Sequence, residues 1–242
     1  MGAHRAETGL AQRLVAAARS LQQQESVEQT FRVVVDTAPE LVDAAEHAGV
    51  TALRRDRTVQ SRAYTGELAL LLDEVQREEG EGPCLAAAER NVVVRIDDMT
   101  AETRWPKFAA RAAELGVRSL ISCGLGLVDG WRVALNFQAR RPGAFGGVSG
   151  QVAALYAEHA ALALGNAATV DSLRGAMNRR QAIGEATGIL MERHRTGSGH
   201  AFGRLVRASQ RLNTKLGVVA EYVTLTGKEP DLITADDLSP AP

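Results

Sequence analysis

The chain has 242 residues, of which 45% are hydrophobic and 24% are charged, so its composition is that of one or two globular domains. No apolar run is long enough to span a bilayer, and the charged, alanine-rich start lacks a secretory pattern, so we expect a cytoplasmic protein without membrane contact. The two cysteines, Cys84 and Cys123, are too few for a disulfide framework or a structural zinc site, and we expect no metal.

The net charge of −1 conceals a basic segment. Residues 171–220 hold nine Lys or Arg and three acids, a net charge of +6, whereas the remainder of the chain carries −7. A basic module attached to an acidic body is typical of a protein that binds a polyanion. A well-solvated helical surface has the same charge count, so charge alone leaves both interpretations open.

Two helices are predicted at the start of the chain. Residues 1–25 are expected to form one helical segment, with a helix over 9–24 on the apolar spacing of Leu10, Leu14, Ala17 and Leu21. Ser26 is suited to cap a second helix over 27–42, because its hydroxyl can accept from a free backbone amide of the first turn. Pro39 is expected to bend or end that helix.

Residues 26–165 read as an α+β domain with a central antiparallel sheet of about five strands and helices against it. A hairpin is predicted over 49–64, and Asp129-Gly130 favours a tight turn between two later strands, because both positions tolerate positive φ. The remaining predicted elements are a helix over 67–79, a short helix over 84–89, a strand over 91–96, a helix from Trp105 to Leu115, and strands over 118–128 and 131–139.

A long helix is predicted from Ser149 to about His194, where the chain has no proline and little turn chemistry. One set of positions recurs with a nearly heptad spacing: Val152, Leu155, His159, Leu162, Asn166, Thr169, Leu173, Met177, Arg180 and Ile183. This period favours a dimerising coiled coil, with residues 150–182 as the connecting helix between two domains. The alternative is a helix packed on its own sheet and followed by an ordinary linker.

Residues 173–227 are predicted to form an all-α bundle of three helices. The second helix is expected over 200–216 and the third over 218–225, and the polar tail 228–242 is expected to be disordered. The predicted core consists of Ile183, Ala186, Leu190, Met191, Phe202, Leu205, Ala208, Leu212, Leu216, Val219, Ala220 and Val223.

A basic stripe is predicted along the second of these helices. Its members, Arg204, Arg207, Arg211 and Lys215, are spaced three and four residues apart, and no acid lies between His200 and Lys215. Such spacing suits a phosphate backbone, where each contact releases a counterion. Gln210 and Asn213 add donors and acceptors for base edges. An ordinary solvated face would usually mix in glutamate, so the stripe favours nucleic acid.

The segment QAIGEATGILMERHRTGSGHAFGRLVRASQRLNTKLGVVAEYVTLTG resembles an ANTAR domain over its whole length. The resemblance implies a three-helix RNA-binding unit of a bacterial antiterminator, which binds paired stem-loops of nascent transcripts as a dimer. Thr187 stands where many family members have Lys, and Gly217 where a charged residue is common. The resemblance implies an RNA-facing surface made of Thr187, Gly188 and the basic stripe, with Arg180 and Arg193 beside it.

The segments GEGPCLAAAERNVVVRIDDM and RWPKFAARAAELGVRSLISCGL, with the glycine hairpin before VALNFQA, resemble a GAF domain over residues 26–165. The resemblance implies a sensor that binds a small molecule between its sheet and helices, although the ligand is unknown from the sequence. Cys84 and Trp105 are the candidate pocket residues. Cys84 is either an oxidant-sensing thiol or a small buried hydrophobe, and Trp105 closes a pocket or caps the core.

The resulting hypothesis is a GAF–ANTAR antitermination regulator of the actinobacterial type, which binds RNA as a homodimer through its long helix and is no enzyme. One alternative is a DNA-binding helix-turn-helix regulator, whose basic helix would lie in a groove. A second is a GAF-type redox enzyme, for which two cysteines are a poor supply. A third is a dimeric scaffold for protein interactions, which would show no salt-dependent binding of nucleic acid.

Overall fold

The computed structural model describes the backbone of residues 2–238 and the side chains of residues 9–238. The chain divides into two compact units, with the boundary between Asp171 and Ser172. None of the helices in this described range combines the length and the apolar character that a bilayer crossing requires.

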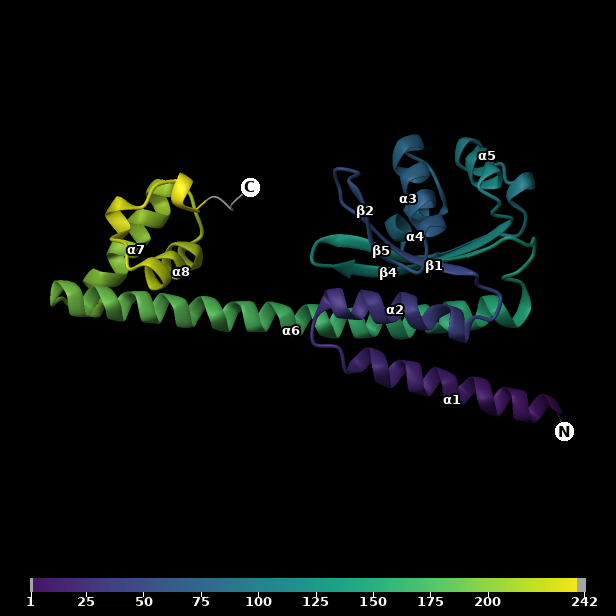
Figure 1. The fold of residues 1–242 in the computed structure, drawn as a ribbon, viewed down its shortest axis with the longest axis horizontal. Coiled ribbons are helices and arrows are strands. Elements are labelled where there is room, and N and C mark those ends of the chain that lie inside the picture. Colours follow the sequence, from purple (N-terminus) through teal and green to yellow (C-terminus); the bar gives the residue numbers. More distant parts are fainter. Residues whose placement is uncertain (1, 239–242) are drawn as a thin grey trace. The chain divides into compact units, whose positions relative to one another are not determined.

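The first unit is built on a five-stranded antiparallel sheet with the strand order β2-β1-β5-β4-β3 (Figure 1). Its strands are β1 (His47–Leu53), β2 (Val59–Tyr64), β3 (Val93–Ile96), β4 (Ser119–Val128) and β5 (Trp131–Ala139). The predicted turn at Asp129-Gly130 joins β4 and β5, with φ angles of 49° and 81°. The α+β class and the antiparallel sheet are therefore confirmed.

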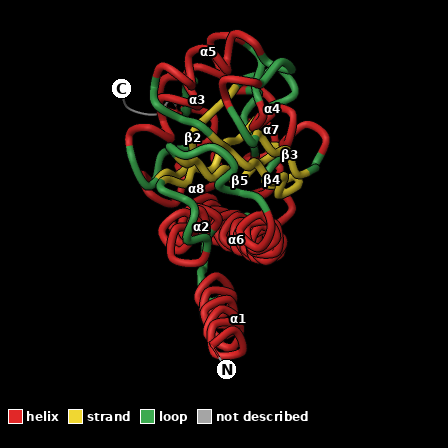
Figure 2. Tube along the Cα trace, turned by 90° about the vertical axis from the view of Figure 1, so that its right-hand side faces the viewer, coloured by secondary structure: helices red, strands yellow, loops and turns green. Residues whose placement is uncertain are grey.

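Helices cover both faces of this sheet (Figures 1 and 2). One face carries α2 (Val27–Leu41) and the start of α6 (Gly147–His194), and α1 (Gly2–Gln22) packs outside them against α2. The other face carries α3 (Glu67–Glu79), α4 (Pro83–Arg90) and α5 (Pro106–Glu114), with the short 3₁₀ helix η1 (Met99–Ala101) before α5.

The entry to α2 follows from its capping chemistry. The Ser26 hydroxyl accepts from the backbone amide of Gln29 at 3.3 Å, as predicted, and the Asp171 carboxylate of α6 accepts from the amide of Val27 at 3.0 Å. Both oxygens satisfy amides that have no partner within the helix. Farther along, the buried Tyr156 of α6 donates its hydroxyl to the carbonyl of Val34 at 3.0 Å, so α6 is fixed to α2 at two points.

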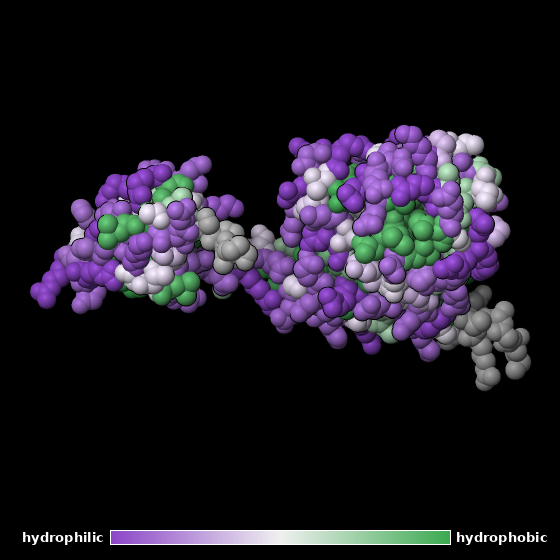
Figure 3. All heavy atoms as spheres, turned by 45° about the horizontal axis from the view of Figure 1, so that its top comes forward, coloured by the Kyte–Doolittle hydropathy of each residue, from purple (hydrophilic) through white to green (hydrophobic). Residues whose placement is uncertain are grey.

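The second unit consists of the end of α6, α7 (Ser198–Leu212), α8 (Leu216–Thr226) and two 3₁₀ turns, η2 (Pro230–Leu232) and η3 (Asp236–Leu238). Seven predicted core residues are at most 1% exposed: Ala186, Leu190, Leu205, Ala208, Val219, Ala220 and Val223. Ile183, Leu212 and Leu216 are half-buried. Met191 and Phe202 were wrongly placed in the core, because 36% and 42% of their surfaces are exposed. The face of this unit in Figure 3 is mostly hydrophilic, with separate hydrophobic areas.

The prediction of a disordered tail over 228–242 is wrong for residues 228–238. Ile233 is fully buried in the core of the second unit, and η2 packs against α7. The sequence pattern is polar, but the buried side chains of Pro230 and Ile233 are enough to hold so short a segment on the bundle. Residues 239–242 lie outside the described residues.

The second predicted helix also ends earlier than expected. We predicted one helix over 200–216, but α7 ends at Leu212 because Asn213 adopts the left-handed conformation, with φ of 49°. Leu216 begins α8, and the predicted interruption at Gly217 is absent because this glycine lies buried in its first turn. Lys215 therefore lies in the turn between α7 and α8, and the basic stripe does not continue to it along one helix.

The long helix is present: α6 runs for 48 residues, from Gly147 to His194. The predicted seam contains both buried and exposed apolar residues. Val152 is 7% exposed and belongs to the core of the first unit, and Ile183 packs on that of the second. The apolar positions between them face outward, with exposed fractions of 48% for Leu155, 65% for Leu162, 62% for Leu173 and 71% for Met177.

Candidate functional sites

The cations of α7 lie beside the core positions of that helix. Ala201, Leu205 and Ala208 are buried, and Arg204 and Arg207 occupy neighbouring positions along the same helix. Arg207 is exposed and forms no ion pair within residues 9–238. This part of the predicted stripe is available to an external anion.

Arg204 differs from Arg207 because acidic residues of the tail cover it. Its guanidinium lies 2.6 Å from the Asp231 carboxylate and 3.1 Å from that of Glu229, and only 15% of its side chain is exposed. Arg193 of α6 contacts Glu229 at 2.9 Å and donates to the carbonyl of Gly227 at 2.7 Å. The stripe was expected to have no acidic partner on its own helix, and the partners of Arg204 indeed come from outside α7.

Arg211 is also engaged by the tail, through backbone atoms instead of carboxylates. Its guanidinium donates to the carbonyls of Pro230 at 2.9 Å and Ile233 at 3.0 Å. These bonds satisfy two carbonyl groups of a short segment that has little secondary structure of its own. Arg211 thus has a structural role in holding the tail on α7.

The other predicted RNA-binding residues are spread over α6 and the turn after α7. Arg180 and Gly188 are exposed on α6, and a side chain at Gly188 would meet open space. The Thr187 hydroxyl donates to the carbonyl of Ile183 at 2.6 Å, one turn earlier, so its donor is used within the helix. Gln210, Asn213 and Lys215 are exposed at the end of α7 and in the following turn.

Sequence reasoning missed the participation of His194 and Glu229. The His194 ring nitrogen Nε2 lies 2.6 Å from Arg204 and 3.0 Å from the Glu229 carboxylate, so both residues belong to the cluster around Arg193 and Arg204. A signal was present in the sequence: the acids of Glu-Pro-Asp at 229–231 directly follow the basic module. Treating that run as a disordered tail hid it.

A second site missed from the sequence is a buried polar network. It lies on the face of the sheet that α3 and α4 cover. The Asp73 carboxylate of α3 accepts from Thr51 and Ser61, each at 2.6 Å. Thr51 accepts from the amide of Asn136 at 2.7 Å, and the Asn136 oxygen accepts from Ser122 at 2.7 Å. Burial raises the pKa of Asp73 to about 6, against the opposing hydrogen bonds from Ser61 and Thr51.

Cys84, a predicted pocket residue, lies at the far end of this network. Its sulfur is 3.4 Å from the Ser122 hydroxyl, and its backbone amide donates to the Gln76 side chain at 2.8 Å. The thiol is 1% exposed, and burial raises its pKa to about 12. A thiol with so high a pKa holds almost no reactive thiolate at neutral pH, so the environment is that of a structural cysteine.

Cys123 and Trp105 are likewise core residues. Cys123 follows Ser122 in β4 and therefore points to the opposite face of the sheet, into the core against α2 and α6. The fold thus separates the two cysteines. Trp105 precedes α5, is half-buried between two apolar clusters, and carries the Arg104 guanidinium 4.5 Å from its ring.

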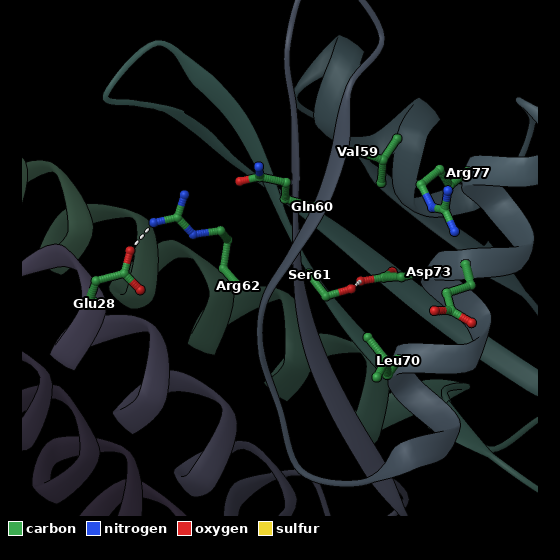
Figure 4. A pocket seen from close by; sticks show the side chains of 9 residues that line it. Glu28, Val59, Gln60, Ser61, Arg62, Leu70, Asp73 and Arg77 are labelled. Carbon is green, nitrogen blue, oxygen red and sulfur yellow. Dashed lines mark hydrogen bonds and ion pairs between the residues drawn. The ribbon is translucent and has the colours of Figure 1, made fainter. Parts of the chain in front are cut away.

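A cleft of about 590 Å³ opens between β2 and α3 (Figure 4). In Figure 4, Asp73 turns toward Ser61 at the base of the cleft, and Arg62 pairs with Glu28 at its side. The network from Cys84 to Asp73 therefore ends at residues that line an open cleft. Within residues 9–238, no group of three or more His, Cys, Asp or Glu side chains is arranged to hold a metal ion.

Comparisons with known proteins identify both units. The model of the GAF domain matches residues 24–165, and the model of the ANTAR domain matches residues 171–223. The chain belongs to the GAF domain family. Its second unit is an ANTAR domain, so both resemblances seen in the sequence are confirmed. No curated protein matches the chain.

Solved structures agree with this fold. The bacteriophytochrome RpBphP3 of R. palustris is similar with a TM-score of 0.59 at 12% identity, over 85% of this chain and 46% of that one. The GAF domain of an Acinetobacter phosphoenolpyruvate-protein phosphotransferase has a TM-score of 0.52 at 13% identity, over 66% of this chain and 95% of that one. The chain thus spans less than half of the bacteriophytochrome, and identities this low show the fold alone.

The pairing of the two domains defines the kind of protein. GAF domains serve as sensor domains, and ANTAR domains are regulatory domains associated with RNA binding. The chain therefore joins a domain of the sensor kind to a domain of the RNA-binding regulatory kind. In the GAF domain the buried network and the cleft lie on the face covered by α3 and α4, and in the ANTAR domain the cations gather on α7 and the end of α6.

Proposed function

We propose that the chain is a signal-responsive transcription antiterminator of the actinobacterial type, acting in the cytoplasm, whose ANTAR domain binds stem-loop RNA. The observation that carries the proposal is the match of an ANTAR domain to the unit that bears the arginines of α7. Arg180, Arg207 and Lys215 support it, because they are exposed and form no ion pair among the described residues. Exposed cations without internal partners are suited to phosphate contacts.

The signal is proposed to act on the face of the GAF domain that carries α3 and α4. A small molecule in the cleft between β2 and α3 would contact Ser61 and break the hydrogen bond that Ser61 donates to Asp73. The hydrogen-bonded network would carry this change across three strands to Ser122 and Cys84. Cys84 and Trp105 then contribute to the wall behind the site and do not themselves contact the ligand.

A homodimer through α6 completes the proposal. Leu155, Leu162, Leu173 and Met177 recur near a heptad period along one helix, and between 48% and 71% of their surfaces are exposed. Apolar side chains exposed at such spacing on a helix are typical of a helix–helix interface. Two ANTAR domains in one dimer would bind two adjacent stem-loops with an affinity that depends on their separation.

The test is a salt series of RNA binding by the full chain, with a structured RNA that contains two adjacent stem-loops. The variant Arg207→Ala/Lys215→Ala removes two cations that have no internal partner, so the fold is expected to survive. We expect tight binding at low salt, and in the variant a salt slope smaller by about 2 and an affinity lower by roughly tenfold.

The matched control is Arg19→Ala/Arg55→Ala, which removes the same charge from the surface of the first unit. It is expected to bind RNA like the wild type. Duplex DNA of the same length serves as a competitor. Equal affinity for duplex DNA and for the stem-loop RNA would contradict the proposal and favour a DNA-binding regulator, and an absence of salt-dependent binding would favour a protein scaffold.

A further inference from the structure

Three side chains of the ANTAR domain converge on one carboxylate. Arg193, His194 and Arg204 approach the Glu229 oxygens at 2.9, 3.0 and 3.1 Å, from the end of α6 and the middle of α7. The Asp231 carboxylate adds a second contact to Arg204, at 2.6 Å. Two guanidinium groups and one imidazole around a single anion form a compact anion-binding site, and here residues of the same chain fill it.

The acidic segment is held in place by contacts that do not depend on these carboxylates. The side chain of Ile233 is fully buried in the core, and Arg211 bonds the carbonyls of Pro230 and Ile233. The Asp237 carboxylate accepts from Lys228 at 2.6 Å and from the amide of Thr234 at 2.8 Å. The fold therefore positions Glu229 and Asp231 over the arginines, and their charges are not needed as anchors.

Carboxylate and phosphate are recognised by guanidinium groups in the same way, through paired N–H donors and a full opposite charge. The site lies directly beside the uncovered part of the basic surface, because Arg207 follows Arg204 by one turn of α7. Side chains three residues apart on a helix are neighbours on its surface, so one RNA strand could contact both Arg207 and the groups that the acidic segment occupies.

We propose that Arg193, His194 and Arg204 form a phosphodiester-binding site, and that Glu229 and Asp231 occupy this site until RNA displaces them. The inference rests on the proposed function and deepens it, because it names part of the RNA contact and its internal competitor. The segment 228–238 then sets a threshold: weakly bound polyanions do not displace the carboxylates, whereas a stem-loop that engages Arg207 and its neighbours does. Burial raises the pKa of Glu229, but bonds from Arg193 and His194 outweigh it and hold this pKa low, so the competitor is charged at neutral pH.

The test compares two full-length variants that remove the same charge from the ANTAR domain. Glu229→Gln/Asp231→Asn neutralises the competitor and keeps its oxygen acceptors. Glu221→Gln/Asp236→Asn neutralises two exposed acids that form no ion pair among the described residues. We expect the first variant to bind the two-stem-loop RNA on the order of tenfold more tightly than the second at the same salt concentration.

A third variant, Arg204→Ala, protects the test against an indirect effect on folding. In the Arg204→Ala background, we expect the gain in RNA affinity from Glu229→Gln/Asp231→Asn to fall to less than half. Neutralising the carboxylates frees Arg204 for a phosphate, and in this background Arg204 is missing. Circular dichroism melting of every variant verifies that the helices are retained. An equal gain in RNA affinity from the two neutralising variants, or a full gain without Arg204, would overturn the inference.

Inorganic phosphate separates this inference from the proposed function. Titration of phosphate, followed through the arginine side-chain NMR signals, is expected to shift Arg193 and Arg204 at lower concentration in Glu229→Gln/Asp231→Asn than in the control. If no variant bound RNA but phosphate showed this difference, the RNA function would be rejected and the anion site supported. If RNA bound every variant equally, the anion site would be rejected and the RNA function retained.

Discussion

At the scale of single residues, the Asp73 carboxylate is buried with hydroxyl partners and has no cationic partner among the described residues. Its pKa is raised from the ordinary 3.8 to about 6 because burial disfavours the charged form. A carboxyl group with a raised pKa binds its proton more tightly in the folded state than in the unfolded state. The folded domain therefore loses stability as the pH rises from about 4 through 6, and the loss is complete above that range.

We predict that Asp73→Asn removes this pH dependence. Asparagine retains an oxygen acceptor for Thr51, and the Ser61 hydroxyl can turn to accept from the new amide. The free energy of unfolding of the variant is compared with that of the wild type at each pH. With pKa values of 3.8 unfolded and about 6 folded, the change caused by Asp73→Asn is expected to be more stabilising at pH 8 than at pH 4.5 by about 2 kcal/mol. Urea unfolding followed by tryptophan fluorescence measures this, since Trp105 and Trp131 both lie in the GAF domain.

The control for this prediction is Asp36→Asn, which removes the same charge from an exposed position on α2. Its effect on the free energy of unfolding should change little between the two pH values. If Asp73→Asn changed the free energy of unfolding equally at pH 4.5 and pH 8, the Asp73 carboxyl would not titrate with a raised pKa.

The two cysteines support a second prediction at this scale. Burial raises the pKa values of Cys84 and Cys123 to about 12, and the fold directs their side chains to opposite faces of the sheet. We expect neither thiol to react with iodoacetamide at pH 7.5 in the folded chain, and both to react in urea. Mass spectrometry counts the labels. Rapid labelling of folded Cys84 would revive the oxidant-sensing interpretation.

At the scale of elements, the segment from η2 to Ile233 behaves as part of the ANTAR fold. We predict that Ile233→Ala destabilises the domain by about 2–4 kcal/mol, because it leaves a cavity among buried side chains. Hydrogen exchange of peptides from α7 and α8 in the full chain measures the loss as faster exchange. The neighbouring Leu232→Ala is the control, because Leu232 is 65% exposed and its truncation opens no cavity.

The elements themselves were largely predictable, because their signals are local. The helix over 67–79 was predicted to the residue, from an amphipathic run that ends where Gly80 adopts a left-handed conformation. The turn at Asp129-Gly130 and the long helix before His194 follow from turn residues and from the absence of proline. The end of α7 was missed because Asn213 and Thr214 can either continue a helix or stop it, and only the tertiary position of α8 decides between these outcomes.

The sites were less predictable, because their partners are distant in sequence. The charge count over 171–220 stopped before Glu229 and Asp231, whereas residues 172–238 contain ten Lys or Arg and seven acids. Periodicity placed Arg204 on a solvated face, but the acids that cover it arrive 25 residues or more later and are held there by Ile233. The Asp73 network joins α3 to strands β1, β2, β4 and β5, which no local pattern reveals.

At the scale of the whole molecule, α6 is the one element among the described residues that belongs to both domains. Its outward apolar side chains occur on both sides of the boundary at Asp171. Leu162 lies in the portion that packs on the GAF sheet, and Leu173 and Met177 in the portion that leads to the ANTAR core. Their exposed fractions are 65%, 62% and 71%, and what distinguishes them from other exposed apolar residues is their near-heptad spacing along one helix. The proposed dimer interface along α6 would cover all three.

We therefore predict that Leu162→Gln/Leu173→Gln/Met177→Gln raises the dissociation constant of the dimer by at least about 100-fold, because six apolar side chains leave the interface. Glutamine keeps the helix and adds no charge, so electrostatic attraction to RNA is unchanged. Sedimentation equilibrium measures the dimer. The affinity for a two-stem-loop RNA should fall to that for a single stem-loop, whereas the affinity for the single stem-loop should stay the same.

The control, Val15→Gln/Leu127→Gln/Leu225→Gln, changes three equally exposed apolar residues outside α6, with exposed fractions of 52%, 70% and 85%. It should leave both the dimer and the two-site affinity intact. A wild type that sediments as a monomer at every concentration would reject the α6 dimer outright. Loss of the dimer with an unchanged two-site affinity would show instead that each ANTAR domain binds its stem-loop independently, and that α6 does not couple the two RNA sites.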